Sequence, residues 1–496
     1  MDCILAIDQG TSSTRALVFD ARGSVLGSAQ REFDQIFPRD GWVEHDPEVL
    51  WDTTLFAARG ALANAGVEAR ELTGIGITNQ RETTVVWDVE TGVAVHNAIV
   101  WQDRRTATRC DKIRADGMAE KIASATGLVI DPYFSSTKVA WLLDTIPGLR
   151  TRAAGGNLRF GTVDSFLIWR LTSGAKHVTD ATNASRTQLF DIGAQRWDTE
   201  LLRYFDIPAN LLPEVLDCSG DFGVADAKWL GGPVPILGVA GDQQAALIGQ
   251  GCFEAGMTKS TYGTGCFLVT NTGEQLIRST NGLLSTVGYR IGGHTTYAVE
   301  GSIFVAGAAV KWLRDSLRIV DSAGETEAAA RRSGVEAGGV YVVPAFTGMG
   351  APHWRPDARG LVCGLSLDTS RDDVIAATLA SVAYQSADLL AALAADGAPV
   401  TRLRVDGGMV ANDWLCQCLA DIAGVRVERP VITETTAFGA GMLAALGGGL
   451  VGSLDAAAGL WQLQRGFEPA MNAPQRERLL NGWADAVSKT LGRHSR

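Results

Sequence analysis

Short apolar runs alternate along this chain with stretches in which apolar residues recur every three or four positions. The short runs predict buried strands, and the wider spacing predicts amphipathic helices. Cys3 to Ile7 is the first short run, Asp8 to Thr14 is a polar turn, and Arg15 to Asp20 is predicted to return as a strand. A third strand is predicted near Val25. The chain is therefore expected to begin with a β-meander whose first turn is polar.

The same pattern of strand, turn and strand recurs after the midpoint. Residues 257–262 predict a strand, Gly263-Thr264-Gly265 a tight turn, and residues 266–270 the returning strand. This weak internal repeat predicts two related domains with a cleft between them, divided near residues 249–256. Hairpins are common in unrelated proteins, so two independent hairpins remain an alternative. Strands that alternate with helices make α/β the expected fold class.

Three further segments are predicted to bring polar residues to the ends of elements. The strand Ile236 to Ala240 ends at Asp242, which precedes a helix, and the strand Leu403 to Val405 ends at Asp406-Gly407-Gly408. Ligands of open α/β sheets bind beyond the carboxyl ends of the strands, so both ends are candidate sites. Ser370 and Asp373 form the pattern of a capping box before a helix with an apolar stripe.

Composition and charge narrow the class of protein. The chain has 496 residues, enough for about two to four domains. Hydrophobic residues make up 46% and charged residues 20%, which indicates a packed core. Asp and Glu number 55 against 44 Lys and Arg, giving a net charge of −11. That balance argues against a general nucleic-acid binder. The basic tail, residues 493–496, is expected to fray.

Several sequence features that mark exported, membrane-bound or zinc-containing proteins are not found in this sequence. The start carries no basic region typical of a signal peptide, and no window approaches about 18 consecutive apolar residues, so no stable membrane insertion is expected. Eight scattered cysteines indicate reduced thiols and a cytoplasmic location. Six scattered histidines argue against a zinc enzyme.

The first polar turn is a candidate phosphate site. Thr11, Ser12 and Ser13 offer hydroxyl and backbone N–H groups to phosphate oxygens, and Arg15 adds a charged donor. Asp8, at the end of the first strand, is a candidate ligand for Mg²⁺, which prefers oxygen ligands. An ordinary hydrophilic hairpin is the alternative, but it does not need so many polar and small residues.

Two glycine turns are weaker candidates for a nucleotide site. Thr264 lies in the matching hairpin turn of the second half, where it would face the first turn across a phosphate chain. Gly408 would let a ligand approach the backbone, and Asn412 is expected on the first turn of the following helix. An ordinary tight turn and an ordinary strand-to-helix turn are the alternatives.

Asp242 and the pair Arg81-Glu82 are the candidates for chemistry on a substrate. Asp242 is expected to act as a general base, and a capping residue of the helix that follows would look the same in the sequence. Arg81 and Glu82, close to Asn79 and Gln80, form a set of donors and acceptors suited to a small polyhydroxy ligand. A surface ion pair, worth well under about 1 kcal/mol, is the alternative for Arg81 and Glu82.

Taken together, these motifs resemble the FGGY family of carbohydrate kinases, and within it the glycerol branch, nearly end to end to about residue 470. Further motifs carry the resemblance: Asn79 to Thr83, Ile99 to Arg105, Tyr133-x-Ser135-x-x-Lys138-x-x-Trp141, Gly241 to Ala246, Tyr262 to Phe267, and Gly360 through Gln385. Their common order makes coincidence negligible.

The resemblance implies a two-domain actin-like, ribonuclease H-like ATPase fold with an interdomain cleft. Residues 1–250 would carry the substrate site and phosphate loop, and residues 251–496 the nucleotide site. The implied reaction is ATP-dependent phosphorylation of glycerol to sn-glycerol 3-phosphate, the first step of glycerol catabolism. Mg²⁺ would bridge the phosphates, and related proteins suggest a homodimer or homotetramer.

The resemblance also implies a role for each site residue. Asp242 would be the base, and Asp8 and Asp242 would hold the metal. Glycerol would be bound by Arg81, Glu82, Tyr133, Asp242 and Gln243, with Trp101 and Phe267 along its carbon side. ATP would contact Thr11, Ser12, Ser13, Arg15, Thr264, Gly307, Lys311, Gly408 and Asn412.

The chain departs from the family pattern at three places. Lys311 stands where the family usually has Gln beside the adenine. The segment Lys228 to Gly232 lacks the Gly-Arg loop that binds fructose 1,6-bisphosphate in some relatives, and the phosphorylatable His of others is missing. We expect neither regulator to act. Two alternatives remain at this stage: a kinase for another polyol or sugar, and a nucleotide-gated assembly protein without small-molecule chemistry.

Overall fold

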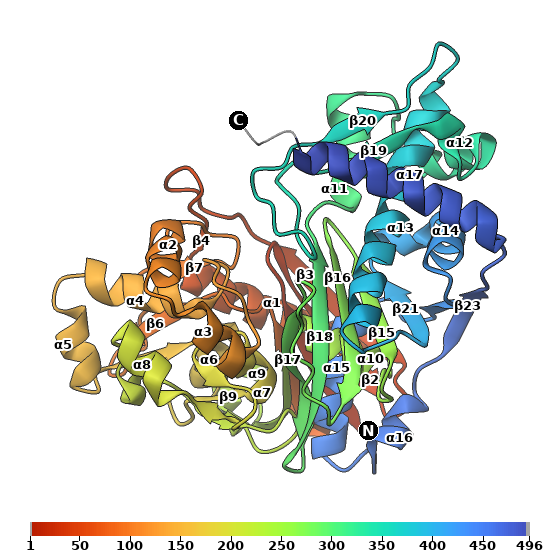
Figure 1. Cartoon of the computed structure of the whole chain (residues 1–496). Helices are drawn as coiled ribbons and strands as arrows, with labels where there is room; N and C mark the ends of the chain where they lie inside the picture. Colours follow the sequence, from red (N-terminus) through yellow and green to blue (C-terminus); the bar gives the residue numbers. More distant parts are fainter. Residues whose placement is uncertain (1, 493–496) are drawn as a thin grey trace.

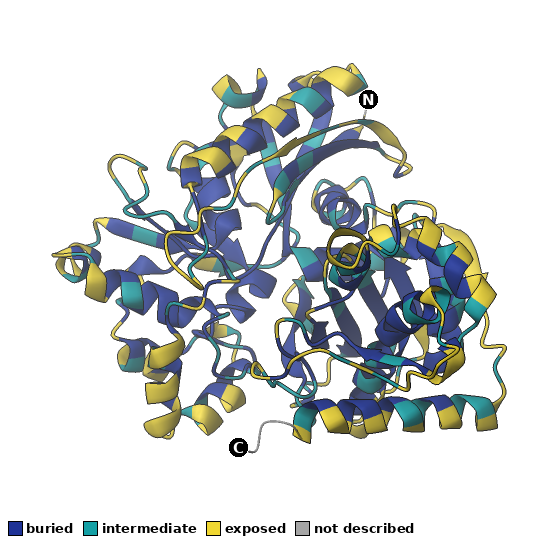
Figure 2. Ribbon diagram, turned by 90° about the horizontal axis from the view of Figure 1, so that it is seen from above, coloured by how far each residue is buried: buried dark blue, intermediate teal, exposed yellow. Residues whose placement is uncertain are grey.

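The computed structural model of the chain describes residues 2–492. The expected fraying of residues 493–496 therefore lies outside the described residues. Two mixed β-sheets form the centre of the molecule, and helices surround them (Figure 1). Buried residues follow the strands and the inner faces of the helices, whereas exposed residues lie on the outer helices and loops (Figure 2).

The first sheet has six strands and is built from the first half of the chain. Its order is β13-β14-β5-β1-β2-β3. Strands β1, β2 and β3 form the expected antiparallel meander, and β5 and β14 run parallel to β1. The bounds are β1 Cys3–Gln9, β2 Ser13–Asp20, β3 Val25–Glu32, β5 Leu72–Asn79, β13 Val224–Ala225 and β14 Val234–Gly241.

The second sheet has seven strands in the order β17-β18-β16-β15-β21-β22-β23. Strands β15 and β16 pair antiparallel across the predicted glycine turn, and β21 and β22 extend the sheet in parallel. The bounds are β15 Met257–Tyr262, β16 Cys266–Gly273, β17 Leu284–Ile291, β18 His294–Ile303, β21 Arg402–Asp406, β22 Val427–Pro430 and β23 Leu463–Phe467.

The two sheets repeat one arrangement. In the first, β1 lies between its hairpin partner β2 and the parallel strands β5 and β14. In the second, β15 lies between its hairpin partner β16 and the parallel strands β21 and β22. The internal repeat expected from the two hairpins thus extends to four strands of each sheet, which makes two independent hairpins an inadequate explanation.

Smaller elements surround this frame. Five two-stranded sheets pair β4 Glu44–His45 with β7 Ala98–Ile99, β6 Val85–Asp88 with β8 Leu158–Gly161, β9 Val178–Asp180 with β12 Glu214–Leu216, β10 Phe190–Asp191 with β11 Arg196–Trp197, and β19 Tyr341–Val343 with β20 Leu361–Cys363. The helices outside the centre are α2 Ala107–Ala115, α3 Ala119–Thr126, α4 Ser135–Thr145, α5 Leu149–Ala154, α6 Val163–Leu171, α7 Ala181–Ser185, α8 Thr199–Phe205, α9 Ala227–Leu230, α11 Gly307–Lys311, α12 Glu325–Ser333, α16 Leu454–Ala458 and α17 Ala473–Gly492.

Helices with clear end signals cover the sheets. Helix α1 (Pro47–Ala65) begins after the capping side chain of Asp46 and packs on β2 and β3. Helix α13 (Arg371–Ala395) opens with the predicted capping box of Ser370 and Asp373. Helix α14 (Asp413–Ala423) lies beside α13. Helix α13 therefore starts where its capping box indicates.

Helix α13 is also the one helix among residues 2–492 whose length and hydropathy satisfy the criterion for a membrane span. The expectation of no membrane-spanning segment was based on consecutive apolar residues. The apolar residues of α13 are not consecutive, so that expectation did not consider this helix. Within the protein, 78% of its apolar 18-residue stretch is buried. Its apolar residues belong largely to the core beside the second sheet.

Two helices cross at the centre of the molecule. Helix α10 (Asp242–Gly249) follows β14, and α15 (Thr435–Gly447) comes from the second half of the chain but packs on β1, β5 and β14. A Cβ atom on Gly439 of α15 would overlap the carbonyl of Ala245 in α10, and one on Gly249 would overlap the carbonyl of Thr435. The backbones of the two helices therefore pack in direct contact.

This contact gives a first prediction. Alanine is a better helix former than glycine by about 1 kcal/mol, so Gly439→Ala would stabilise an isolated helix. Here the added methyl group meets backbone atoms that cannot rotate away, and overpacking of this kind costs about 1–3 kcal/mol or more. We expect a lower thermal unfolding temperature for Gly439→Ala. Gly452→Ala, which would add its methyl group in open space, is the control, and a rise in Tm for Gly439→Ala would contradict the contact.

Candidate active site

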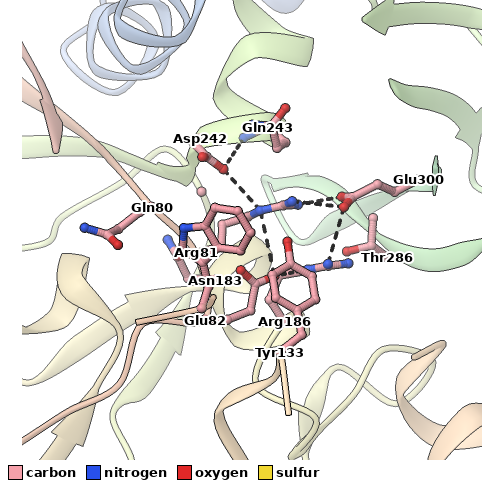
Figure 3. Close-up of polar contacts among 12 residues, drawn as sticks. Gln80, Arg81, Glu82, Tyr133, Asn183, Arg186, Asp242, Gln243, Thr286 and Glu300 are labelled. Carbon is pink, nitrogen blue, oxygen red and sulfur yellow. Dashed lines mark hydrogen bonds and ion pairs between the residues drawn. The ribbon is translucent and has the colours of Figure 1, made fainter. Parts of the chain in front are cut away.

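The residues expected to meet a polyhydroxy substrate lie together between the two sheets (Figure 3). Arg81 and Glu82 follow β5, and Asp242 is the first residue of α10 beyond the end of β14. The Nε atom of Arg81 lies 3.1 Å from Oδ1 of Asp242. Arg81 and Glu82 are only 3% and 1% exposed, so the surface ion pair considered from the sequence is wrong. The two side chains are parts of a buried ionic network.

Two further charged residues complete this network. Glu300, on β18 of the second sheet, accepts hydrogen bonds from both terminal nitrogens of Arg81, at 2.6 and 2.9 Å. Arg186, just after α7, donates to Oε1 of Glu82 at 2.6 Å and to Oε1 of Glu300 at 3.3 Å. Burial alone would raise the pKa of Glu300, but Arg186 and Arg81 outweigh it and lower this pKa to about 2. Glu300 is therefore charged at neutral pH.

The backbone at Glu82 is held in an uncommon conformation. Glu82 has a φ of 58°, in the left-handed region that favours glycine. Its carbonyl accepts hydrogen bonds from Ser135 Oγ at 3.0 Å and from Lys138 Nζ at 3.2 Å. Lys138 also donates to the carbonyl of Tyr133 at 2.8 Å, and burial lowers the pKa of this amine to about 7. The start of α4 thus fixes the turn that carries Arg81 and Glu82.

Three aromatic side chains from both halves of the chain form one wall of the site. Trp101, after β7, meets Tyr133 edge to face with ring centroids 5.6 Å apart. Trp101 also meets Phe267 of β16 at 6.2 Å. These rings offer an apolar surface beside the ionic network, as expected for the carbon side of a small polyol. Burial, and the charge of Glu82, raise the pKa of Tyr133, so its hydroxyl stays protonated and can donate.

Gln243 and Asp242 occupy the first turn of α10. The carboxylate of Asp242 accepts a hydrogen bond from the backbone of Gln243 at 2.7 Å through Oδ1. Gly241, not Asp242, is the capping residue of α10, so capping does not account for this carboxylate. The side-chain carbonyl of Gln243 accepts a hydrogen bond from the buried Lys259. The amide of Gln243 is thereby oriented at the end of β14.

The first polar turn is shorter than expected, because β1 continues to Gln9 and β2 begins at Ser13. Thr11 accepts a hydrogen bond from Trp101 Nε1 at 2.9 Å, which links this turn to the aromatic wall. Ser13 accepts from Gln30 at 3.0 Å, and Ser12 is exposed. Arg15 is paired with Gln30 and with Glu434, so a phosphate at this turn would compete for Arg15.

The second glycine turn packs on the start of α11. Backbone groups of Gly307 and Ala308 donate to the carbonyls of Gly263 and Thr264 at 2.9 and 3.0 Å. A Cβ atom on Gly307 would lie 2.5 Å from the Gly263 carbonyl, so this close approach requires glycine. Thr264 itself is exposed, and Lys311 is exposed at the end of α11.

The turn after β21 borders a cavity of about 650 Å³. Gly407 has a φ of 90° and packs against Tyr262, whereas a Cβ atom on Gly408 would meet open space. Asn412 is the capping residue of α14 and not part of its first turn, because its Oδ1 accepts from the backbone of Leu415 at 2.9 Å. Gly408 is thus accessible to a ligand, and Asn412 offers its side-chain amide.

Asp8 lies close enough to Asp242 for their charges to interact. Burial, and then the charge of Asp242, raise the pKa of Asp8 to about 7, and Arg15 opposes this shift. The carboxylate of Asp8 accepts no hydrogen bond from residues 2–492. Within that range no group of three or more His, Cys, Asp or Glu side chains could hold a metal alone. Two neighbouring carboxylates nevertheless fit Mg²⁺, which usually takes one or two carboxylates with waters and phosphate oxygens.

Sequence reasoning missed the buried charges that support the site. Glu300 lies in an apolar strand segment, and Arg186 follows the polar run Thr182-Asn183-Ala184-Ser185. A single charged residue within a buried strand needs an oppositely charged partner, so the sequence could have indicated that Glu300 forms a buried ion pair. Which arginine it pairs with depends on contacts between positions 219 residues apart, and no local pattern gives that.

Comparison with known proteins identifies relatives over the whole chain. Residues 3–249 match the N-terminal domain, and residues 258–447 the C-terminal domain, of the FGGY family of carbohydrate kinases. Glycerol kinase of Alcanivorax borkumensis is 59% identical over 490 residues, which cover 99% of this chain and 98% of that protein. Glycerol kinase 1 of Pseudomonas aeruginosa is 58% identical over 486 residues, 98% of both chains.

Solved structures share the fold. The structure of Plasmodium falciparum glycerol kinase with ADP has a TM-score of 0.92 and 35% identity, covering 99% of this chain and 98% of that one. Xylulose kinase of Lactobacillus acidophilus has a TM-score of 0.89 at 20% identity, covering 100% and 99%, which extends the likeness in fold alone. The expected two-domain α/β fold of the actin-like class is confirmed.

Proposed function

This chain belongs to the FGGY family of carbohydrate kinases, and from that premise we propose that it transfers the γ-phosphoryl group of ATP to glycerol. The product would be sn-glycerol 3-phosphate. The observation that carries the proposal is the cluster in which Arg81, Glu82 and Asp242 lie between the sheets beside an aromatic wall. Relatives named glycerol kinase, 58–59% identical over nearly the whole chain, support this substrate over another polyol or sugar.

The residues suit a ligand that has three hydroxyl groups and little apolar surface. A site that satisfies each hydroxyl rejects ligands that leave its own buried polar groups without partners. Arg81 and Tyr133 supply donors, and Glu82 and Asp242 supply acceptors. Trp101 and Phe267 would cover the carbon side. An actin-like assembly protein without small-molecule chemistry would not need this set.

Asp242 is the proposed general base. Its Oδ1 atom is engaged by Gln243 and Arg81, whereas Oδ2 has no partner among residues 2–492. Oδ2 is thus available to accept the proton of a primary hydroxyl. The hydroxyl oxygen bonds to the γ-phosphorus, the bond to the β,γ-bridging oxygen breaks, and ADP leaves with that electron pair. Such transfer depends chiefly on alignment and on charge neutralisation.

The turns around Thr11 and Thr264 are proposed to hold the phosphate chain, and Gly307, Lys311, Gly408 and Asn412 the nucleoside. Ser12, Ser13 and Arg15 would add donors on the first turn. Asp8 and Asp242 would hold Mg²⁺, which neutralises phosphate charge when it is bound. Closure of the two domains over the cleft would exclude water from the site and limit hydrolysis of ATP.

The substrate is tested with a coupled assay of ADP release. We expect turnover with glycerol to exceed turnover with xylulose, gluconate, ribulose and erythritol, because only glycerol fills the site without an unpaired polar group. Equal or greater kcat/KM with any of the other four compounds would contradict glycerol as the substrate. ATP consumption that does not depend on any of the five would contradict the proposed function as a whole.

Regulation gives a further prediction. The short helix α9 and its flanks, Lys228 to Gly232, lack the Gly-Arg loop expected of a fructose 1,6-bisphosphate site. We expect fructose 1,6-bisphosphate at millimolar concentration to leave the initial rate unchanged. Marked inhibition in a titration, with Mg²⁺ held in excess to avoid chelation, would show that a site exists elsewhere.

Several other expectations stay predictions. They are the division into units 1–250 and 251–496, a cytoplasmic location, a role in the first step of glycerol catabolism, no binding of nucleic acid, no stable membrane insertion, and a homodimer or homotetramer. The two sheets lie on either side of residue 250, but α15 crosses to the first sheet. A separated N-terminal unit would therefore lose a helix from its core.

A further inference from the structure

The ionic network leaves Arg81 little freedom to bind a substrate by itself. One terminal nitrogen donates to Glu300 at 2.6 Å and to Gln244 at 3.1 Å, and the other donates to Glu300 at 2.9 Å. The Nε atom forms an ion pair with Oδ1 of Asp242 at 3.1 Å. Three of the five N–H groups of this guanidinium therefore already donate hydrogen bonds, which leaves two for Asp242 and a substrate hydroxyl. Most of this side chain is committed to holding other residues.

We propose that Glu300 is a positioning residue that acts on Asp242 through Arg81. In this arrangement Arg186 fixes the positions of the Glu300 and Glu82 carboxylates relative to each other. The inference rests on the proposed function, in which Asp242 is the base. Glu300 fixes both terminal nitrogens of Arg81, and this bidentate pairing sets the plane of the guanidinium. The same plane keeps Nε 3.1 Å from Oδ1 of Asp242 as an ion pair, which leaves Oδ2 for the hydroxyl that reacts.

Arg186 connects the two carboxylates. Its Nε donates to Glu82 and one terminal nitrogen donates to Glu300. Its guanidinium also lies over the rings of Tyr133 and Phe134, 5.6 and 5.4 Å from their centroids. Arg186 thus links Glu82 and Tyr133, both proposed to bind glycerol, to the carboxylate that orients Arg81.

The network also joins the two halves of the molecule. Glu300 lies on β18 of the second sheet, whereas Arg81, Arg186 and Asp242 belong to the first half of the chain (Figure 3). The turns proposed to hold the phosphates belong to β1-β2 and β15-β16, one in each half. The ion pair between Arg81 and Glu300 therefore holds Asp242 at a fixed position relative to the second sheet, which carries the second phosphate turn.

Stability alone explains this arrangement poorly. Glu300, Arg81, Glu82 and Arg186 are each 3% exposed or less, and buried ion pairs are frequently no more stabilising than apolar residues of the same volume. Among residues 2–492, the NH1 group of Arg186 is buried without any hydrogen-bond partner. An unpaired buried donor is unfavourable, which is typical of groups kept for function.

The test compares Glu300→Gln, Glu300→Asp and Arg186→Lys with the unmodified full chain. We measure kcat for glycerol phosphorylation, expressed per ADP-binding site, together with KM for ATP. Misplacement of a reacting group by about 1 Å costs about 10²-fold in rate, so we expect Glu300→Gln to lower kcat by about that factor at unchanged KM for ATP. Glu300→Asp keeps the charge and should recover part of the loss. Arg186→Lys loses the planar fork and should also lower kcat.

The matched control is Glu428→Gln on β22 of the same sheet. Glu428 is a buried carboxylate that pairs with Arg404 at 3.2 Å and with Arg426 at 3.0 Å, and neither arginine belongs to the ionic network of Arg81 and Glu300. We expect it to lower the unfolding temperature but not kcat per ADP-binding site. If Glu300→Gln does not fold, the kcat values of Glu300→Asp and Arg186→Lys test the positioning role.

Failure of the proposed function and failure of the positioning role give different results. Unmodified protein that releases no ADP in response to glycerol would defeat the proposed function. Active unmodified protein, together with folded Glu300 and Arg186 variants that keep the unmodified kcat, would overturn the positioning role alone. A parallel loss of ADP-binding sites and of activity, with kcat per site unchanged, would overturn it as well, because that is the effect of a purely structural residue.

Discussion

Asp242→Asn is expected to lower kcat for glycerol phosphorylation by about 10²–10⁴-fold, the usual contribution of a general base. The amide keeps the shape of the side chain but cannot accept the proton of the substrate hydroxyl. The Asp242 side chain is 30% exposed and receives its ion pair from a single arginine, so the fold should tolerate the change. Steady-state kinetics with saturating ATP and glycerol give kcat, and the unfolding temperature verifies folding.

A matched control is available in the same helix turn. Gln243→Asn retains an amide at the neighbouring position and leaves Asp242 in place, so its kcat should fall far less than that of Asp242→Asn. Folded Asp242→Asn protein that keeps normal turnover would contradict the assignment of the base. A rise in KM for glycerol with unchanged kcat would reduce Asp242 to a binding residue.

Arg81→Met is expected to have the second-largest effect, because it damages the site and the core together. Removing one partner of a buried ion pair leaves the other charge uncompensated, at a cost of about 3–5 kcal/mol. Among residues 2–492, Glu300, which is fully buried, would then keep Arg186 as its one ion-pair partner. The loss of a charged donor, combined with a displaced Asp242, should lower kcat/KM for glycerol by about 10²–10³-fold.

The pH dependence of unfolding follows from the same pair. Burial raises the pKa of Glu300, but Arg186 and Arg81 lower it from 4.5 to about 2. A carboxyl whose pKa is lower in the folded state stabilises the fold above its unfolded pKa and loses that effect as pH falls through the folded value. Between pH 4.5 and 2 this contribution declines in the unmodified protein. Without Arg81 the folded pKa of Glu300 rises and its stabilising contribution shrinks, so the acid-unfolding midpoint should move to higher pH. An acid-unfolding midpoint unchanged from that of the unmodified protein would contradict the pairing.

Local sequence patterns located the strand ends that carry the site. The apolar run before Asp242 and the run before Asp406 both form strands, and the capping box at Ser370 opens α13. The end of a strand can be predicted from the sequence because the run of apolar residues gives way there to polar or small residues. The polar turn after β1 was found in the same way, although its bounds are narrower than expected.

The supporting charges could not be located in this way. Arg81 and Glu82 were recognised as a pair, but they interact mainly with other partners: Arg81 with Glu300, and Glu82 with Arg186. Those contacts depend on the approach of two sheets that are far apart in the chain. The crossing of α15 onto the first sheet was also unforeseen, since the glycines that permit it resemble ordinary helix glycines.

A crystal structure with glycerol and a non-hydrolysable ATP analogue bound together tests the proposed mechanism most directly. We expect Oδ2 of Asp242 within about 2.6–3.2 Å of a primary hydroxyl, the reach required of a general base. That hydroxyl should point at the γ-phosphorus, with the phosphates between the turns that carry Thr11 and Thr264. A carboxylate turned away from the alcohol, or phosphates bound elsewhere, would contradict the mechanism.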